Sequence, residues 1–229
     1  MPWKDAFLDA LALLSPVECA GCGSPDRSLC GDCRATLEPA PTPRQTPGGL
    51  TVITALRYEA QVRRIILAFK EQHRTDVAPA LAAALGSAVH RAADTSTDMP
   101  ELVAVPTSRS AYRRRGYDPV ALLLRRSGAR PARVLVSARR TAHQKSLGVL
   151  DRRENLRDAF AARGSLMGRR FVIVDDVLTT GATIDEAARA LSEAGAEVLA
   201  GATLAFTPRW SGFRDIPRDE DYGWAKGAQ

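Results

Sequence analysis

The chain has 229 residues, of which 45% are hydrophobic and 25% charged, and its formal net charge at pH 7 is +6. This composition is typical of a globular protein and excludes a collagen, a coiled coil and a wholly disordered chain. Lysine occurs only at positions 4, 70, 145 and 226, so the other basic residues are arginines. Arginine suits the binding of phosphate groups, although a codon bias toward arginine explains the excess equally well.

The N-terminal segment, residues 2–14, has apolar residues at helical spacing. Asp5 and Asp9 interrupt it and no basic n-region precedes it, so the pattern predicts an amphipathic helix and not a signal peptide. No apolar run approaches the roughly 20 residues that span a bilayer. We therefore expect no membrane insertion and a cytoplasmic location.

Two Cys-x-x-Cys pairs follow within a short stretch, formed by Cys19 and Cys22 and by Cys30 and Cys33. Four thiolates at this spacing are typical of a tetrahedral structural Zn²⁺ site. A redox pair or inert thiols are the alternatives, but a redox motif is not expected twice in so few residues. Residues 1–38 are thus predicted to form a helix and a zinc module, and the Pro- and Gly-rich residues 39–49 a linker or exposed loop.

Strands and helices alternate through the next segment, residues 50–207, which we take as the main domain. Strands are expected at residues 50–58, 102–105, 134–137, 171–174 and 197–206. Helices are expected at residues 61–69, 77–93, 117–126 and 183–194. This order predicts an α/β fold, a mostly parallel sheet flanked by helices. Residues 208–229 are expected to form a polar tail.

The strongest motif follows the apolar run at residues 171–174. Two acids come first, Asp175 and Asp176, and a loop that opens a helix comes next. The residues of this loop are Thr179, Thr180, Gly181, Ala182 and Thr183. Unpaired N–H groups at a helix start bind phosphate, and the carboxylates could accept hydrogen bonds from vicinal hydroxyls or hold a divalent cation. The motif predicts a site for a ribose 5-phosphate, since helix capping alone would need only one of these side chains.

Residues 174–183 resemble the phosphoribosyl pyrophosphate (PRPP) signature of type I phosphoribosyltransferases. Weaker motifs in the same order resemble the ComF family of competence-associated, phosphoribosyltransferase-like proteins. They are Tyr58-Glu59, Phe69-Lys70, Val105-Pro106, Arg113-x-Arg115-Gly116-Tyr117, Arg140-Thr141-x-x-Gln144 and Arg152-x-x-Asn155. The chain departs from the family at three places, with Ala60 in place of a glycine, Asp118-Pro119 in place of Asn-Gln, and Ser108-Arg109 in place of His-Pro.

The resemblance implies that PRPP binds with Mg²⁺ through Asp175, Asp176 and the loop from Thr179 to Thr183. It implies a pyrophosphate loop over residues 106–115, with Arg109, Arg113 and Arg115 as ligands. It also implies a flexible catalytic loop over residues 139–150 that carries Arg140, and this loop is expected to become ordered when PRPP binds. The four-cysteine zinc module is a family feature as well.

Two functions follow from the resemblance and stay open. The first is an enzyme that transfers a phosphoribosyl group to an unidentified nitrogen acceptor, with Asp175, Asp176 and Arg140 as catalytic residues. The second is a non-catalytic competence protein that handles single-stranded DNA during DNA uptake, in contact with the competence machinery. Only 6% of residues are aromatic, which weakens the case for a base-stacking surface.

Overall fold

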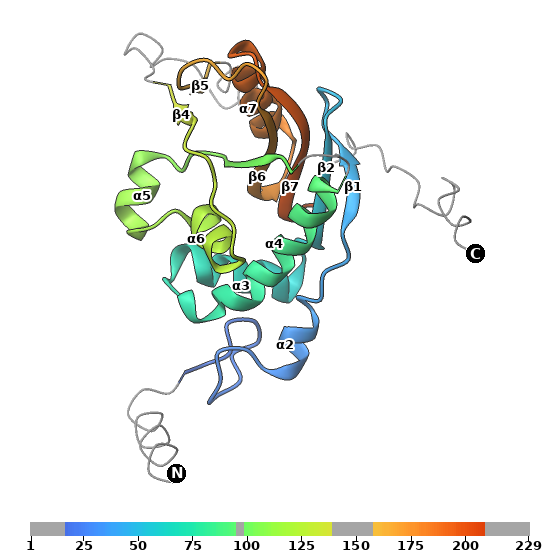
Figure 1. The fold of residues 1–229 in the computed structure, drawn as a ribbon. Coiled ribbons are helices and arrows are strands. Elements are labelled where there is room, and N and C mark those ends of the chain that lie inside the picture. Colours follow the sequence, from blue (N-terminus) through green and yellow to red (C-terminus); the bar gives the residue numbers. More distant parts are fainter. Residues whose placement is uncertain (1–16, 95–98, 139–157, 209–229) are drawn as a thin grey trace, which may run out of the picture.

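The computed structural model describes residues 17–94, 99–138 and 158–208. Their strands form a five-stranded sheet in the order β1-β2-β7-β6-β3 and a two-stranded sheet of β4 and β5. The expected α/β fold with a mostly parallel sheet is confirmed (Figure 1). The expectations for the first helix, for the loop at residues 139–150 and for the tail beyond residue 208 lie outside the described residues.

Four of the five strands are parallel, and only the edge strand β1 runs antiparallel to its neighbour. In sheet order they are β1 (Thr42–Gln45), β2 (Thr51–Arg57), β7 (Glu197–Phe206), β6 (Arg170–Leu178) and β3 (Glu101–Ala104). The smaller sheet pairs β4 (Leu135–Ser137) with β5 (Phe160–Ala162) in antiparallel orientation. The strand expected at residues 134–137 therefore exists, but it does not belong to the main sheet.

Helices cover both faces of the main sheet. The helices α3 (Ala60–Glu71), α4 (Ala78–Ala93) and α6 (Pro119–Arg126) share one cluster of buried side chains with β2, β6 and β7. The helix α7 (Ala182–Glu193) and the β4–β5 pair share a second cluster with the other face. Short helices complete the described part, namely α2 (Gly31–Ala35), η1 (Thr75–Val77) and α5 (Arg109–Arg115).

The proline-rich segment before β2 was expected to be a linker or an exposed loop, but part of it forms a strand. Residues 42–45 form β1, in which Thr42 pairs with Thr54 and Pro43 with Ile53. A proline is compatible with an edge strand because its missing N–H group can face away from the sheet. The segment thus extends the sheet and does not separate two bodies.

The cysteine-containing segment packs against the main domain. Cys19, Leu29, Cys33 and Leu37 are buried in the same cluster as the apolar face of α3. In addition, the Arg74 side chain donates a hydrogen bond to the Glu18 carbonyl at 2.9 Å. The small segment therefore completes the core on this face of the sheet.

The first residue of α3 has an unusual backbone conformation, with φ +36° at Ala60. Glycine adopts this left-handed region without steric cost, whereas the Cβ atom of alanine makes it strained. We expect Ala60→Gly to raise the free energy of unfolding by about 0.5–1 kcal/mol, measured by urea denaturation. Ala83, which is exposed within α4, is the matched control, because Ala83→Gly should lower that free energy by about 1 kcal/mol. A loss of stability in both variants would contradict the strain at Ala60.

Candidate functional site at the carboxyl ends of the strands

The two adjacent acids lie inside β6, which runs on to Leu178 instead of ending at Val174 as expected. Successive side chains of a strand point to opposite faces. Ile173 belongs to the cluster on the α7 face and Val174 to the cluster on the α3 face. Asp176 accordingly lies on the α3 face, where it meets a side chain of α3.

Asp176 forms an ion pair with Lys70, the penultimate residue of α3, at 2.6 Å between Nζ and Oδ2. Both side chains are 21% exposed, so the pair is partly shielded from water but remains within reach of a ligand. The lysine thereby neutralises a carboxylate of the proposed ribose site. The sequence singled out Lys70 as a residue of the family pattern and as a cation at a helix end, but nothing in the local sequence indicated its partner.

Asp175 is partly buried, and its Oδ1 accepts a hydrogen bond from the Asp176 backbone N–H at 2.8 Å. Burial, and then the negative charge of Asp176, raise the pKa of Asp175 to about 8. At neutral pH this carboxyl group is therefore largely protonated, and a protonated carboxyl can donate a hydrogen bond as well as accept one.

The loop between β6 and α7 brings the remaining predicted residues beside the acids. Gly181 precedes the first residue of α7 with φ +79° and, as a glycine, has no side chain to cap the helix. Thr180 Oγ1 accepts a hydrogen bond from the Ala182 N–H at 3.3 Å, while Thr179 is exposed. The first N–H groups of a helix lack partners within the helix and carry its positive dipole end. The loop can therefore receive an anion at the position that the sequence predicts.

A turn that the sequence did not indicate covers this loop. Asp185, in the first turn of α7, accepts hydrogen bonds from the Thr46 hydroxyl at 2.5 Å and from the Gly48 N–H at 2.9 Å. This holds the β1–β2 turn against Gly181, where a Cβ atom would lie only 3.0 Å from Thr46. Glycine is thus required at 181 both for its backbone conformation and for the space beside it.

The segment expected as a pyrophosphate loop contains the helix α5, which begins after Ser108 and ends at Gly116. Arg114 and Arg115 pair with Glu71 of α3 at 3.2 and 2.5 Å. Arg109 and Arg113 are exposed and contact no acid within the described ranges. The structure therefore places Arg115 beside the Lys70–Asp176 pair along α3, while Arg140 lies outside the described residues.

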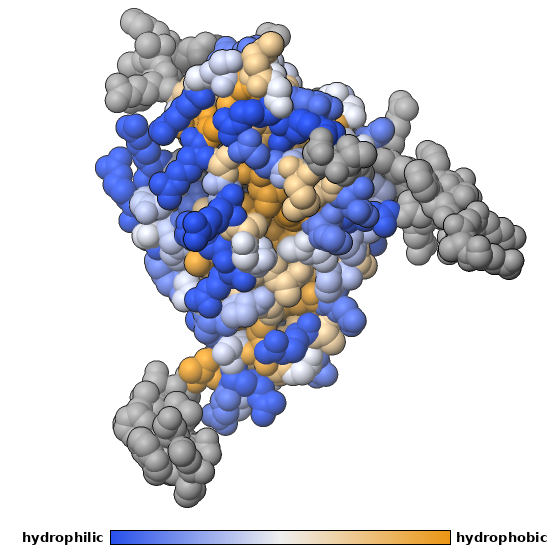
Figure 2. All heavy atoms as spheres, in the orientation of Figure 1, coloured by the Kyte–Doolittle hydropathy of each residue, from blue (hydrophilic) through white to orange (hydrophobic). Residues whose placement is uncertain are grey.

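A basic groove runs beside α5, between the end of β3, α6 and β4, and encloses about 960 Å³. Four arginines line it, namely Arg125, Arg130, Arg133 and Arg163. All four are exposed, and no ion pair joins them to the described residues. The one acid in the lining, Asp118, accepts a hydrogen bond from the Ala121 N–H and so caps α6. Figure 2 shows hydrophilic residues gathered over this α5 side of the molecule.

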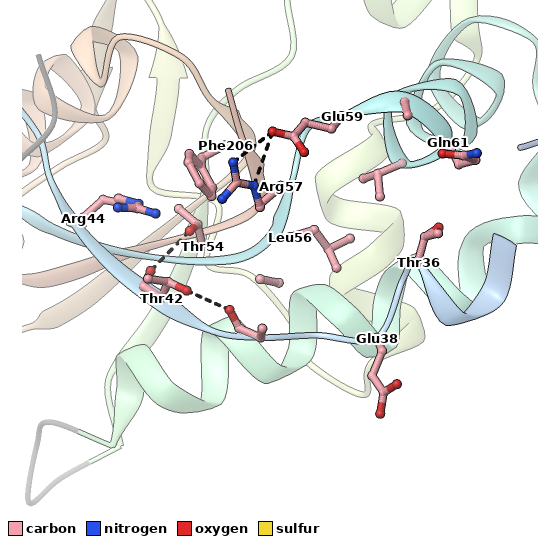
Figure 3. A pocket seen from close by; sticks show the side chains of 14 residues that line it. Thr36, Glu38, Thr42, Arg44, Thr54, Leu56, Arg57, Glu59, Gln61 and Phe206 are labelled. Atoms are coloured by element: carbon pink, nitrogen blue, oxygen red, sulfur yellow. Dashed lines mark hydrogen bonds and ion pairs between the residues drawn. The ribbon is translucent and has the colours of Figure 1, made fainter. Parts of the chain in front are cut away.

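A second pocket, of about 410 Å³, lies between β1, β2 and the start of α3 (Figure 3). The ring of Phe206 faces the guanidinium carbons of Arg44 at 4.3 Å and Arg57 at 5.9 Å. Arg57 also pairs with Glu59 at 3.0 Å. The pocket is on the β2 side of β7, whereas the acids are on its β6 side, so it is a neighbour of the predicted site and not part of it.

The four cysteines meet in one place, with their Sγ atoms all within 4.8 Å of one another. The Sγ atoms of Cys22 and Cys30 are 3.6 Å apart, close to the separation of about 3.8 Å that tetrahedral bonds of about 2.3 Å to one metal require. The Cys30 N–H donates a hydrogen bond to Cys19 Sγ at 3.3 Å, and the Cys33 N–H donates one to Cys30 Sγ at 3.4 Å. The geometry therefore fits a metal ion held by four thiolates.

The thiols of this cluster differ in acidity. Burial raises the pKa of Cys19, but hydrogen bonds from the backbone N–H groups of Cys30, Cys22 and Gly21 outweigh it and lower the pKa to about 6. Burial and the neighbouring cysteines strongly raise the pKa of Cys33. Four thiolates this close repel one another, and a divalent cation would remove that repulsion.

Among the helices of the described ranges, none has the length and apolarity needed to cross a bilayer.

A family comparison and several curated proteins show what this chain is similar to. The phosphoribosyl transferase domain family matches residues 79–224. The DNA utilization protein YhgH of Escherichia coli K12 is 30% identical over 190 residues, covering 78% of this chain and 84% of that protein. Competence protein F of Haemophilus influenzae is 29% identical over 196 residues, covering 78% and 86%. Among solved structures, orotate phosphoribosyltransferase from Aeropyrum pernix is 16% identical with a TM-score of 0.30, covering 76% and 90%, a likeness too weak to carry an argument.

Proposed function

The chain belongs to the ComF family, whose members are competence-associated proteins with a phosphoribosyltransferase domain, and from this premise we propose that it binds PRPP. The observation that carries the proposal is the end of β6, where two carboxyl groups lie next to an uncapped helix start. Carboxyl groups suit a diol and a helix start suits a phosphate. PRPP carries both groups on one ribose.

The 5-phosphate would bind at the start of α7, on the N–H groups and hydroxyls of residues 179–183. The ribose hydroxyls would bind Asp176, which is charged and held by Lys70, and Asp175, which is largely protonated. The pyrophosphate would bind the arginines of α5, namely Arg109, Arg113 and Arg115. Each charged part of the ligand would thus meet a group of opposite charge or a hydrogen-bond partner.

Magnesium fits this arrangement as a partner of the ligand. Asp176 is already neutralised by Lys70 and Asp175 is largely protonated, so these carboxyls do not form a ready cation cage. Mg²⁺ is commonly held by substrate phosphates and water with few protein ligands. When bound, it would supply neutralisation of the pyrophosphate charge.

Transfer of the phosphoribosyl group to a nitrogen acceptor would then rest on positioning and electrostatics. The acceptor nitrogen would form a bond to the ribose C1, the bond from C1 to pyrophosphate would break, and the acceptor would lose a proton. The arginines of α5 would stabilise the charge that develops on the departing pyrophosphate. The acidic end of β6 would hold the ribose hydroxyls in place during this step.

We further propose that the four-cysteine cluster holds one structural Zn²⁺. Cysteine thiolates in a closed tetrahedral set are typical of zinc. Because Cys19 and Cys33 are also buried in the core cluster that includes α3, the metal would stabilise the contact between this segment and the main domain.

The basic groove favours a second candidate function, the handling of single-stranded DNA. The names of the relatives refer to DNA utilization and competence. The groove offers four exposed arginines, and Tyr112 in its lining is 51% exposed. Arginines that neutralise a phosphate backbone bind without sequence preference and with strong salt dependence.

Titration calorimetry at two salt concentrations separates the two functions. We expect saturable binding of Mg²⁺–PRPP near one per chain. If the groove also binds DNA, a mixed-sequence oligonucleotide should bind about tenfold or more weakly when the salt is raised fourfold. Arg130→Ala with Arg133→Ala should then reduce oligonucleotide binding and leave PRPP binding unchanged. An absence of PRPP binding at both salt concentrations would overturn the proposed function.

A further inference from the structure

The C-terminal end of α3 contacts two parts of the proposed PRPP site, β6 and α5, and also the Tyr117 side chain that follows α5. The Phe69 carbonyl accepts a hydrogen bond from the Tyr117 hydroxyl. The next residue, Lys70, pairs with Asp176 of β6 at 2.6 Å. The one after it, Glu71, pairs with Arg115 at 2.5 Å and with Arg114 at 3.2 Å, both from α5.

The geometry of a helix end explains this convergence. Successive helical residues point about 100° apart, so three in a row reach three directions. The last carbonyl groups of a helix have no partner within it, which frees the Phe69 carbonyl for Tyr117. One short segment can therefore hold β6 on one side and the segment from α5 to Tyr117 on the other.

The helix α5 depends on such polar contacts for its position. None of its residues is buried, so it contributes little to the core. Its two partnered arginines both contact Glu71, and Arg115 is only 12% exposed. The two arginines that have no acidic partner in the described part of the chain, Arg109 and Arg113, are thus carried on a helix that Glu71 holds in place.

We propose that Lys70 and Glu71 are positioning residues that set the α5 arginines relative to Asp176. The inference rests on the proposed function, because α5 would carry the pyrophosphate site and Asp176 the ribose site. Lys70 orients the carboxylate for the ribose hydroxyls, and Glu71 orients the arginine helix for the pyrophosphate. Two adjacent residues of α3 thereby fix the separation between the two ends of the ligand.

The opposite role for Glu71 is that of an internal anion that competes with pyrophosphate for the arginines. The division of the arginines argues against it. Of the three proposed pyrophosphate ligands, Glu71 engages only Arg115 and leaves Arg109 and Arg113 open to solvent. The two roles predict changes of opposite sign when the carboxylate is removed, so one substitution decides between them.

The test measures the affinities of two separate probes, pyrophosphate and ribose 5-phosphate, by calorimetry. We expect Glu71→Gln to weaken pyrophosphate binding about five- to tenfold and to change ribose 5-phosphate binding less than about twofold, the scale of one lost positioning contact. Lys70→Met should show the reverse selectivity, weakening ribose 5-phosphate about fivefold. The matched control is Glu101→Gln, which removes a similar carboxylate–arginine pair, with Arg169 at 2.7 Å, at the other end of the sheet.

Tighter pyrophosphate binding in Glu71→Gln would overturn positioning in favour of competition. Equal losses of affinity for pyrophosphate and ribose 5-phosphate would also overturn the proposal, because a general destabilisation of the protein would weaken both. Hydrogen exchange without ligand gives a second measurement that does not depend on binding. Residues 109–115 should exchange faster in Glu71→Gln and not in Glu101→Gln. If the native protein binds neither pyrophosphate nor ribose 5-phosphate, the proposed function fails. If hydrogen exchange of residues 109–115 is unchanged in Glu71→Gln, Glu71 does not hold α5, whatever the binding result.

Discussion

Replacing Asp175 and Asp176 together by asparagine is expected to weaken PRPP binding by about 3 kcal/mol, which corresponds to two hydrogen bonds that involve charged or strongly polar groups. The expectation follows from their place at the end of β6 beside the start of α7. Asparagine keeps the size of each side chain but removes the charge of Asp176 and the proton of Asp175. Titration calorimetry with Mg²⁺–PRPP measures the loss.

The control for this experiment is Asp94→Asn, which changes an exposed acid at the end of α4. It should leave PRPP affinity unchanged. Ribose 5-phosphate, which lacks the pyrophosphate group, should lose about as much affinity as PRPP does in the double variant. An equal loss for both ligands assigns the effect to the ribose end of PRPP. Unchanged PRPP affinity in the double variant would remove both acids from the site.

The raised pKa of Asp175 makes the free energy of unfolding depend on pH. Burial and the charge of Asp176 raise the pKa of Asp175 from 3.8 to about 8, so the folded state binds a proton that the unfolded state has released. The contribution of Asp175 to stability therefore falls as the pH rises from about 4 to about 8. Asp175→Asn should flatten the fall in this range, measured by urea denaturation at several pH values. An unaltered slope would contradict the raised pKa.

Removal of the metal from the four-cysteine cluster is expected to have the largest effect on folding. Binding of structural Zn²⁺ by four thiolates contributes about 10 kcal/mol or more. The cluster holds residues 17–38 together, and Leu29 and Leu37 of this segment are buried with α3. We therefore expect chelation, or Cys33→Ala, to unfold this segment and to lower the thermal midpoint of the whole protein.

Elemental analysis of protein purified without added metal should give one zinc per chain. The matched control is Arg27→Ala, which alters an exposed residue between the two cysteine pairs and should retain the metal. Thiol titration provides the second measurement, since bound thiolates react slowly under native conditions. A zinc content near zero, with four freely reactive thiols in the folded protein, would rule the site out.

Local sequence pattern was sufficient for most of the elements of the main domain. The apolar spacing of Val62, Ile65 and Phe69 predicts α3 because a helix must bury one face, and the structure buries these residues. The apolar run at residues 171–174 likewise predicts a central strand, and β6 lies between two parallel neighbours. The pattern failed for β1 and β5, which are short, and for α5, which buries no side chain and so leaves no periodic signal.

The sequence by itself determined the residue types of the candidate sites, because Cys-x-x-Cys pairs and an acid–acid–Thr-Thr-Gly run are local in the chain. Only the tertiary structure decided how these residues are partnered. Glu71 and Arg115 are 44 positions apart and Thr46 and Asp185 are 139 positions apart. Such contacts depend on which helix end comes to rest beside which strand end, and local periodicity carries no information about that. The position of the acids within a strand, and not after its end, also followed only once β6 was seen to continue through them.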